Sequence, residues 1–120
     1  VSSGDSLIYF TGGVNYDRFL SAISMNRNLK LAEKNGKTSL FSRLTREKDS
    51  YLKHPVAWYK FNKEIFIYNT FTRKWAFLDD NEFTARAGAS LLLLNKCFII
   101  IGGEIKPGIR TPDVMLLRLL

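Results

Sequence analysis

Two apolar runs that each end in a pair of glycines constrain this chain most. "LIYFTGG" (7–13) and "FIIIGG" (98–103) carry β-branched and aromatic residues, and their glycine pairs, 12–13 and 102–103, stand 90 residues apart. Each run predicts a strand that stops where the backbone approaches a neighbour closely. The same device used twice indicates a fold built from repeated strand units.

The sequence between the two runs divides into helical and strand-like parts. Apolar residues at helical spacings predict two helices within 17–53, or one helix and a partly ordered segment, with a turn at "NGKTS". Strand character returns after His54-Pro55. The predicted strands are 6–13, 56–62, 64–70, 73–79, 89–95, 97–103 and 113–120, with a polar loop over 79–88 and a tight hairpin turn at Asn95-Lys96.

The repeat has the period of a kelch blade. Removing an insertion of about 40 residues leaves a repeat of roughly 50, and Tyr68 and Trp75 stand seven positions apart across the turn in "YNTFTRKW", like the aromatic pair of kelch blades. The sequence therefore predicts an all-β fold, a partial kelch β-propeller of about two blades, in preference to an unrelated antiparallel sandwich.

The predicted organisation places one partial propeller over 1–120. Blade strands are expected at 6–16 and 54–80 around the inserted helical segment 17–53, and the next blade at 86–120. Closure of a propeller needs four to eight blades. We therefore expect the remaining blades to come from a longer chain or from association.

Composition excludes several classes of site. The formal net charge of +7 attracts anions of any kind. The single cysteine, Cys97, permits no intrachain disulfide, and no Cys/His cluster has metal-ligand spacing, so no metal site is expected. No run reaches the roughly 18 apolar residues of a membrane span. The first ten residues, "VSSGDSLIYF", do not show the basic and apolar regions expected of a signal peptide.

The insertion is strongly basic. We favour a solvated helical face, with a lid above an anionic substrate as an alternative, because the charge is too diffuse for the usual pattern of nucleic-acid binding. The residues concerned are Arg27, Lys30, Lys34, Lys37, Arg43, Arg46, Lys48 and Lys53.

Four short motifs carry a family resemblance. "TGGVN" (11–15), "YKFNK" (59–63), "RAGAS" (86–90) and "GGEIKPGIRT" (102–111) occur in this order, with the insertion after the first. They resemble the N-acetylneuraminate (sialic acid) epimerase/mutarotase family of bacterial kelch propellers, or its cyclically permuted subfamily, over about 6–119. The resemblance implies six blades, an isomerase without cofactor, an anionic sugar as substrate, and a periplasmic or secreted location.

The same resemblance assigns the catalytic pair. Interconversion of the α and β anomers opens and recloses the sugar ring, which moves a proton from the anomeric hydroxyl to the ring oxygen. Glu104 occupies the position of the family's functional glutamate and is the expected acid/base. Arg110 is the expected fork for the substrate carboxylate. Lys106 would add positive charge or be a solvated surface lysine. Alternatively, Glu104 and Arg110 form a structural ion pair that fixes the loop.

Three further residues are candidates for substrate binding. Asn15 would hydrogen-bond sugar hydroxyls or cap a turn. Arg86 would point toward the channel or pair with a neighbouring loop, and Tyr59 would stack on the sugar or pack. The expected function is a sugar-acid mutarotase that is active only in the complete propeller, so that this chain alone is inactive. The alternative is a non-enzymatic kelch module that binds a protein or a carbohydrate.

Overall fold

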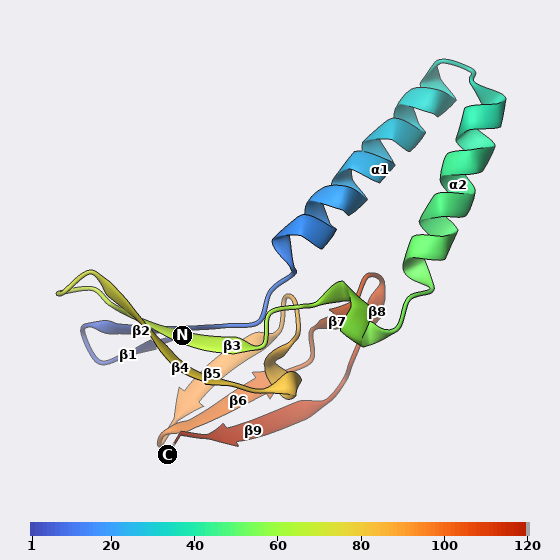
Figure 1. The fold of residues 1–120 in the computed structure, drawn as a ribbon. Coiled ribbons are helices and arrows are strands. Elements are labelled where there is room, and N and C mark those ends of the chain that lie inside the picture. Colours follow the sequence, from blue (N-terminus) through green and yellow to red (C-terminus); the bar gives the residue numbers. More distant parts are fainter. Residues whose placement is uncertain (120) are drawn as a thin grey trace. The chain divides into compact units, whose positions relative to one another are not determined.

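The computed structural model describes residues 1–119, which form two compact units (Figure 1). One unit joins Val1–Val14 to the chain from Phe61 onward and contains all the strands. The other, Asn15–Lys60, contains both long helices.

The first sheet has four antiparallel strands in the order β1-β2-β3-β4. Tyr68 pairs with Trp75 across the β3–β4 hairpin, and their ring centroids lie 4.9 Å apart. Asn69 sets the turn of this hairpin, because its Oδ1 accepts hydrogen bonds from the backbone N–H groups of Phe71 and Thr72, both at 3.0 Å. The strands are β1 (Ser2–Ser3), β2 (Leu7–Thr11), β3 (Glu64–Asn69) and β4 (Lys74–Asp80).

The second sheet has three antiparallel strands in the order β5-β6-β9. The predicted tight turn at Asn95-Lys96 is confirmed, since both residues have positive φ (50° and 61°), as a type I′ hairpin requires. The strands are β5 (Ser90–Leu94), β6 (Cys97–Ile101) and β9 (Val114–Arg118). Between β6 and β9 the chain forms a separate two-stranded hairpin, β7 (Glu104–Lys106) and β8 (Ile109–Arg110).

The core lies where the two sheets face each other. Ile65 of β3 and Phe98 and Ile100 of β6 are at most 3% exposed, and they pack with partly buried side chains from both sheets. Tyr9 contacts Phe98 edge to face, with centroids 5.2 Å apart. Strand alternation directs these residues into one layer, so the two sheets pack face to face.

The opposite face of the first sheet is apolar and exposed. Phe10, Phe66, Trp75 and Phe77 are 38–60% exposed, and the Phe10 and Trp75 rings contact each other at 5.0 Å. A contiguous aromatic face of this kind marks a packing surface. Blades of a propeller pack face to face, so we expect this surface to be covered by another blade.

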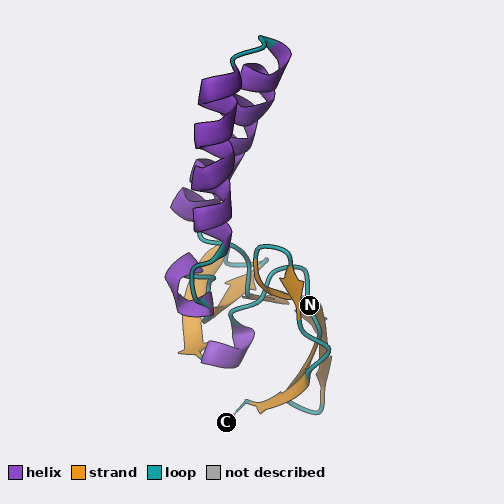
Figure 2. Cartoon of the chain, turned by 90° about the vertical axis from the view of Figure 1, so that its right-hand side faces the viewer, coloured by secondary structure: helices purple, strands orange, loops and turns teal. Residues whose placement is uncertain are grey.

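The helical unit is an antiparallel hairpin of α1 (Tyr16–Lys34) and α2 (Thr38–Leu52) (Figure 2). The two predicted helices are thus confirmed. The residues of α1 that are not exposed recur at spacings of four and three, which is the heptad seam of a coiled coil. They are Arg18, Ala22, Met25, Leu29 and Ala32. Phe19 and Ile23, each 47% exposed, lie outside this seam.

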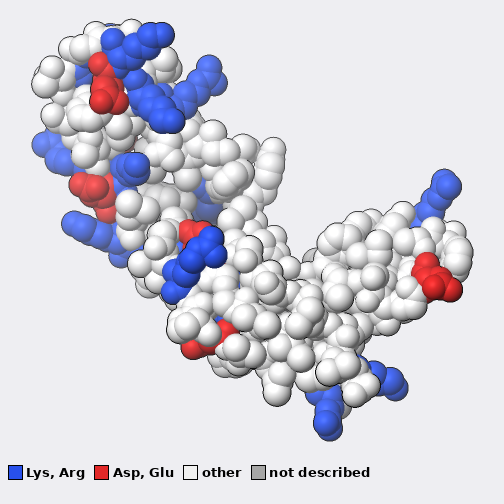
Figure 3. Space-filling view, turned by 180° about the vertical axis from the view of Figure 1, so that it is seen from behind, with Lys and Arg blue, Asp and Glu red and all other residues white. Residues whose placement is uncertain are grey.

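Most of the net charge belongs to the helical unit. Asn15–Lys60 contains ten Lys and Arg against four Asp and Glu, a net charge of +6 out of the +7 of the chain. Figure 3 shows these basic side chains spread over the helices rather than gathered in one patch. The preferred interpretation, a solvated basic face, therefore remains a prediction that this distribution favours.

The prediction of a strand over 56–62 is wrong. Val56–Tyr59 form a 3₁₀ helix, which ends at Lys60 in the left-handed region (φ 50°). The aromatic and β-branched residues that suggested a strand pack locally instead. Trp58 stacks on His54 with centroids 3.8 Å apart, and Arg18 lies 3.6 Å from the centroid of the Trp58 ring.

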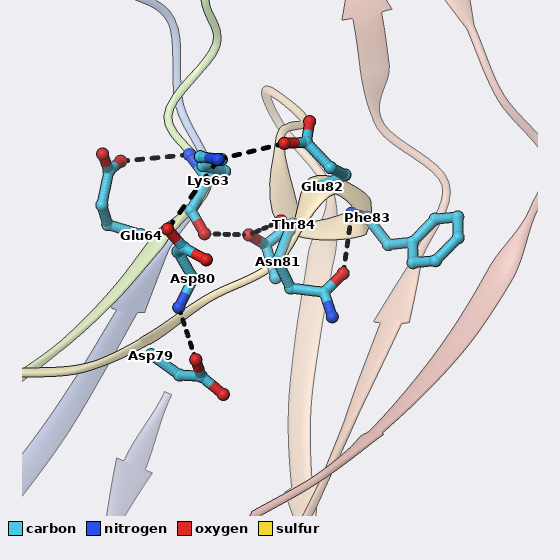
Figure 4. A network of polar contacts seen from close by, with 8 residues as sticks. All are labelled: Lys63, Glu64, Asp79, Asp80, Asn81, Glu82, Phe83 and Thr84. Atoms are coloured by element: carbon cyan, nitrogen blue, oxygen red, sulfur yellow. Dashed lines mark hydrogen bonds and ion pairs between the residues drawn. The ribbon is translucent and has the colours of Figure 1, made fainter.

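A polar network fixes the segment that connects the two sheets (Figure 4). Lys63 Nζ lies 3.0 Å from Glu82 and 3.8 Å from Asp80, and the hydrogen bond to Glu82, followed by the charge of Asp80, raises the pKa of this lysine. Thr84, 2% exposed, places its Oγ1 within hydrogen-bond distance of the Asn81 and Lys63 carbonyls. These contacts hold in place the start of the segment that connects the two sheets, residues 81–89 (the connecting segment).

Candidate functional site

The β7–β8 hairpin brings the two predicted catalytic residues together. Glu104 and Arg110 are direct cross-strand partners in this hairpin. Partners opposite each other in an antiparallel pair project from the same face, with Cβ atoms about 5 Å apart. The two residues therefore start from the same face of the hairpin, although six residues separate them in sequence.

A backbone donor in the turn holds the Glu104 carboxylate. Its Oε1 accepts a hydrogen bond of 2.5 Å from the N–H of Gly108. Gly108 has φ +80°, a conformation that glycine adopts at little cost and that turns this N–H toward the strand. The Pro107-Gly108 pair in the sequence indicates the turn but does not predict this contact.

Arg110 is exposed and forms no ion pair with a carboxylate of residues 1–119. The structural ion pair with Glu104 is therefore not formed in this structure. An exposed guanidinium without a carboxylate partner is able to donate two parallel hydrogen bonds to an anionic ligand. Lys106 lies in β7, partly exposed, two residues from Glu104.

The start of the hairpin is bound to the connecting segment by its backbone. Glu104 N–H donates to Ala87 C=O at 2.8 Å, and Ala87 N–H donates to Glu104 C=O at 2.9 Å. Gly103 has φ +95°, and a Cβ there would lie 2.8 Å from the Ala89 Cβ. Only glycine allows this approach, which brings β7 onto the connecting segment.

The first glycine pair meets the same segment from the other sheet. Gly13 N–H donates to the Arg86 carbonyl at 2.8 Å, and a Cβ on Gly12 would lie 2.3 Å from that oxygen. The prediction that the glycines end strands at close backbone contacts is thus confirmed, and the structure identifies residues 84–89 as the shared contact.

Arg86 lies almost completely buried beneath the hairpin. It is 5% exposed, and its Nη1 donates to the carbonyls of Gly102 (3.0 Å) and Asp113 (3.1 Å). These contacts lie within the protein, so substrate binding by Arg86 stays a prediction that the observed contacts do not favour.

Asn15 and Tyr59 belong to the helical unit. Asn15 is the N-cap of α1, since its Oδ1 accepts a hydrogen bond from Arg18 N–H at 3.1 Å. Tyr59 is 0% exposed, and its hydroxyl donates to the Tyr51 carbonyl at 2.5 Å. Burial raises the pKa of Tyr59. Both side chains are engaged in the structural alternatives considered for them, and their roles in binding stay predictions.

A cavity of about 190 Å³ lies beside the first glycine pair. Arg86, Thr84 and Leu91 are among the residues that line it, and none of its lining residues belongs to the β7–β8 hairpin. The Thr11 Oγ1 is buried and has no hydrogen-bond partner among residues 1–119. The pair Glu104–Arg110 therefore lies outside this cavity.

Two further features are absent from residues 1–119. No group of three or more His, Cys, Asp or Glu is placed to hold a metal ion. Neither helix of this region has the length and apolar character that crossing a bilayer demands.

Comparison with known proteins gives one consistent result. Residues 1–119 match the family model for N-acetylneuraminate epimerase. The N-acetylneuraminate epimerase of Salmonella enteritidis PT4 is 28% identical over 114 residues, which cover 92% of this chain and 26% of that protein. The enzyme of the same name from Brucella melitensis biotype 1 is 26% identical over 123 residues, covering 99% of this chain and 29% of that protein.

A solved structure agrees with this match. That of YjhT superimposes with a TM-score of 0.74 at 27% identity, covering 99% of this chain and 32% of the YjhT chain. The two sheets are thus part of a kelch-type β-propeller, and the chain spans between a quarter and a third of the length of these relatives. The resemblance noted in the sequence is confirmed, and the chain belongs to the N-acetylneuraminate epimerase family.

Proposed function

We propose that the intact protein interconverts the α and β anomers of N-acetylneuraminate, with Glu104 and Arg110 as the central residues of its site. The observation that carries this proposal is their cross-strand pairing on one hairpin, with the carboxylate held by Gly108 and the guanidinium exposed. The printed names of the relatives supply the substrate class.

The interconversion requires one group that accepts and returns a proton and one group that binds the sugar carboxylate. Glu104 takes the proton of the anomeric hydroxyl as the bond from the anomeric carbon to the ring oxygen breaks. The same carboxyl group gives a proton to the ring oxygen, which leaves an open-chain ketone and an unchanged carboxylate. Rotation and reclosure by the reverse steps produce the other anomer.

Arg110 fixes the substrate during these steps. Its fork binds the sugar carboxylate next to the anomeric carbon by charge-assisted hydrogen bonds. Lys106 adds positive charge at the same hairpin. Asn15 and Tyr59 remain proposed contributors from the helical unit. We place the activity in the periplasm or outside the cell, and only in the complete propeller, because the exposed hairpin forms one wall of a site and other blades supply the rest.

The test is the rate of anomer exchange of freshly released α-N-acetylneuraminate, followed by NMR with the intact protein. Glu104→Gln should lower the catalysed rate by roughly a hundredfold or more, the usual contribution of a general acid/base. Glu33→Gln, on an exposed position of α1, is the matched control. If the wild-type protein does not exceed the spontaneous rate, the enzymatic proposal fails and the chain is part of a binding module.

A further inference from the structure

Arg86 is a buried cation whose partners are backbone carbonyls. It is 5% exposed, and no carboxylate of residues 1–119 forms an ion pair with it. Burying a charge is costly unless its hydrogen-bond donors are satisfied. The Nη1 atom of Arg86 meets this condition, because it donates hydrogen bonds to the carbonyl oxygens of Gly102 and Asp113. Burying such a charge costs free energy of folding, which stability alone does not explain. The position of Arg86 therefore indicates a local role.

The two carbonyls bracket the catalytic hairpin. Gly102 lies two residues before Glu104, and Asp113 lies three residues after Arg110. The Asp113 carbonyl oxygen also accepts a hydrogen bond from Gly102 N–H at 3.0 Å. The Arg86 guanidinium and the Gly102 N–H therefore donate to the same oxygen. A single guanidinium nitrogen therefore joins the two ends of the hairpin that carries Glu104 and Arg110.

The backbone around Arg86 extends the same connection. Ala87, its neighbour, exchanges two hydrogen bonds with Glu104, and the Arg86 carbonyl accepts from Gly13. The side chain thus fixes both ends of the hairpin while its own backbone is held by the adjacent sheet.

We propose that Arg86 is a positioning residue for the mutarotase site, which sets the orientation of Glu104 and Arg110 by clamping the base of their hairpin. The inference rests on the proposed function and departs from direct substrate binding by Arg86. Displacement of a reacting group by about 1 Å lowers rates by up to about a hundredfold. Loss of the clamp therefore acts on the chemical step more than on binding.

Arg86→Met and Arg86→Lys in the intact protein test this role. Arg118→Gln, which removes an exposed arginine from β9, is the control. We expect Arg86→Met to lower kcat about tenfold or more with KM within about twofold, and Arg86→Lys to restore part of kcat. Should Arg86→Met not fold, Arg86→Lys carries the test, with a reduced kcat and an unchanged KM.

A substrate analogue separates positioning from binding. If Arg86 touched the substrate carboxylate, its replacement would raise KM, and the loss would vanish with the neutral carboxamide of the sugar. A loss of kcat that persists with the carboxamide supports the clamp. A loss confined to the carboxylate substrate, or no loss at all, overturns it.

Hydrogen exchange provides a readout that does not require activity. The N–H groups of Gly102 and Thr111, which bond to Asp113 and Gly103 across the base of the hairpin, should exchange faster in Arg86→Met, while the amides of β5 and β6 keep their protection. Unchanged exchange at the base would overturn the clamp even if the protein proved not to be a mutarotase. Inactivity of the wild type with faster exchange at the base would sink only the proposed function.

Discussion

Gly12 and the carbonyl oxygen of Arg86 approach each other so closely that a Cβ on residue 12 would lie 2.3 Å from this oxygen. The next residue, Gly13, donates its N–H to the same oxygen at 2.8 Å. The first sheet thus contacts the segment that supports the β7–β8 hairpin through backbone alone. This contact links the glycine repeat of the sequence to the position of the candidate site.

Gly12→Ala should destabilise the intact protein far more than Gly4→Ala. Both glycines have positive φ (77° and 60°), so both substitutions carry a backbone cost of about 1–2 kcal/mol. A Cβ on Gly4 meets nothing within 4 Å, whereas that on Gly12 meets backbone atoms that cannot move aside, which adds roughly 2 kcal/mol. Urea denaturation measures both, and equal losses would show that the close contact carries no energetic weight.

Two buried threonine hydroxyls provide a second matched pair. Thr84 Oγ1 bonds to backbone carbonyls, so Thr84→Val should cost about 1–3 kcal/mol of unfolding free energy. Thr11 Oγ1 is buried without a partner among residues 1–119, so Thr11→Val should be neutral or stabilising by up to about 1 kcal/mol. Thermal unfolding of both variants decides this, and a loss in Thr11→Val equal to that in Thr84→Val would contradict it.

The strand and helix patterns were largely readable because they depend on local periodicity. Alternation identified the strands around Tyr68 and Trp75, and positive φ at Asn95-Lys96 follows from the turn chemistry of the pair. The error at 56–62 arose because Trp58 and Tyr59 have high strand propensity, whereas their packing with Tyr51 and His54 selected a 3₁₀ helix. Tertiary contacts of this kind leave no periodic signal.

The candidate site was readable only in part. The motif at 102–111 identified Glu104 and Arg110, but their opposition depends on a hairpin with an irregular register between Glu104 and Lys106. The role of Arg86 depends on two carbonyls, 16 and 27 residues away in sequence. Backbone acceptors have no side-chain identity, so no residue pattern could have indicated this clamp.

Arg110→Lys and Arg110→Ala should separate charge from the planar fork. If the fork binds the sugar carboxylate, Arg110→Ala should lower kcat/KM by about 10- to 100-fold, the loss expected for charge-assisted hydrogen bonds. The kcat/KM of Arg110→Lys should lie between that of the wild type and that of Arg110→Ala, because an ammonium supplies charge without the bidentate geometry. Arg27→Ala, on the exposed side of α1, is the control. Full activity in Arg110→Ala would remove this residue from the site.

Tyr59 should make the protein sensitive to alkaline pH. Burial, the largest cause, raises the pKa of Tyr59 above 10, and burial together with the Tyr59 charge raises that of Tyr51. The unfolded chain therefore loses these protons first, so the stabilisation is complete below about pH 10 and is lost as pH rises through the folded-state pKa values. The wild-type unfolding free energy should fall steeply above pH 10.

Tyr59→Phe isolates this effect. Below pH 9 the variant should be about 1 kcal/mol less stable, because the hydrogen bond from the Tyr59 hydroxyl to the Tyr51 carbonyl is lost. Above pH 10 its stability should fall less steeply than that of the wild type, so the two curves converge. Tyr16→Phe, at a 71% exposed position, is the control and should follow the wild-type curve. Parallel curves for Tyr59→Phe and the wild type would show that the Tyr59 hydroxyl ionises as freely in the folded protein as in the unfolded chain.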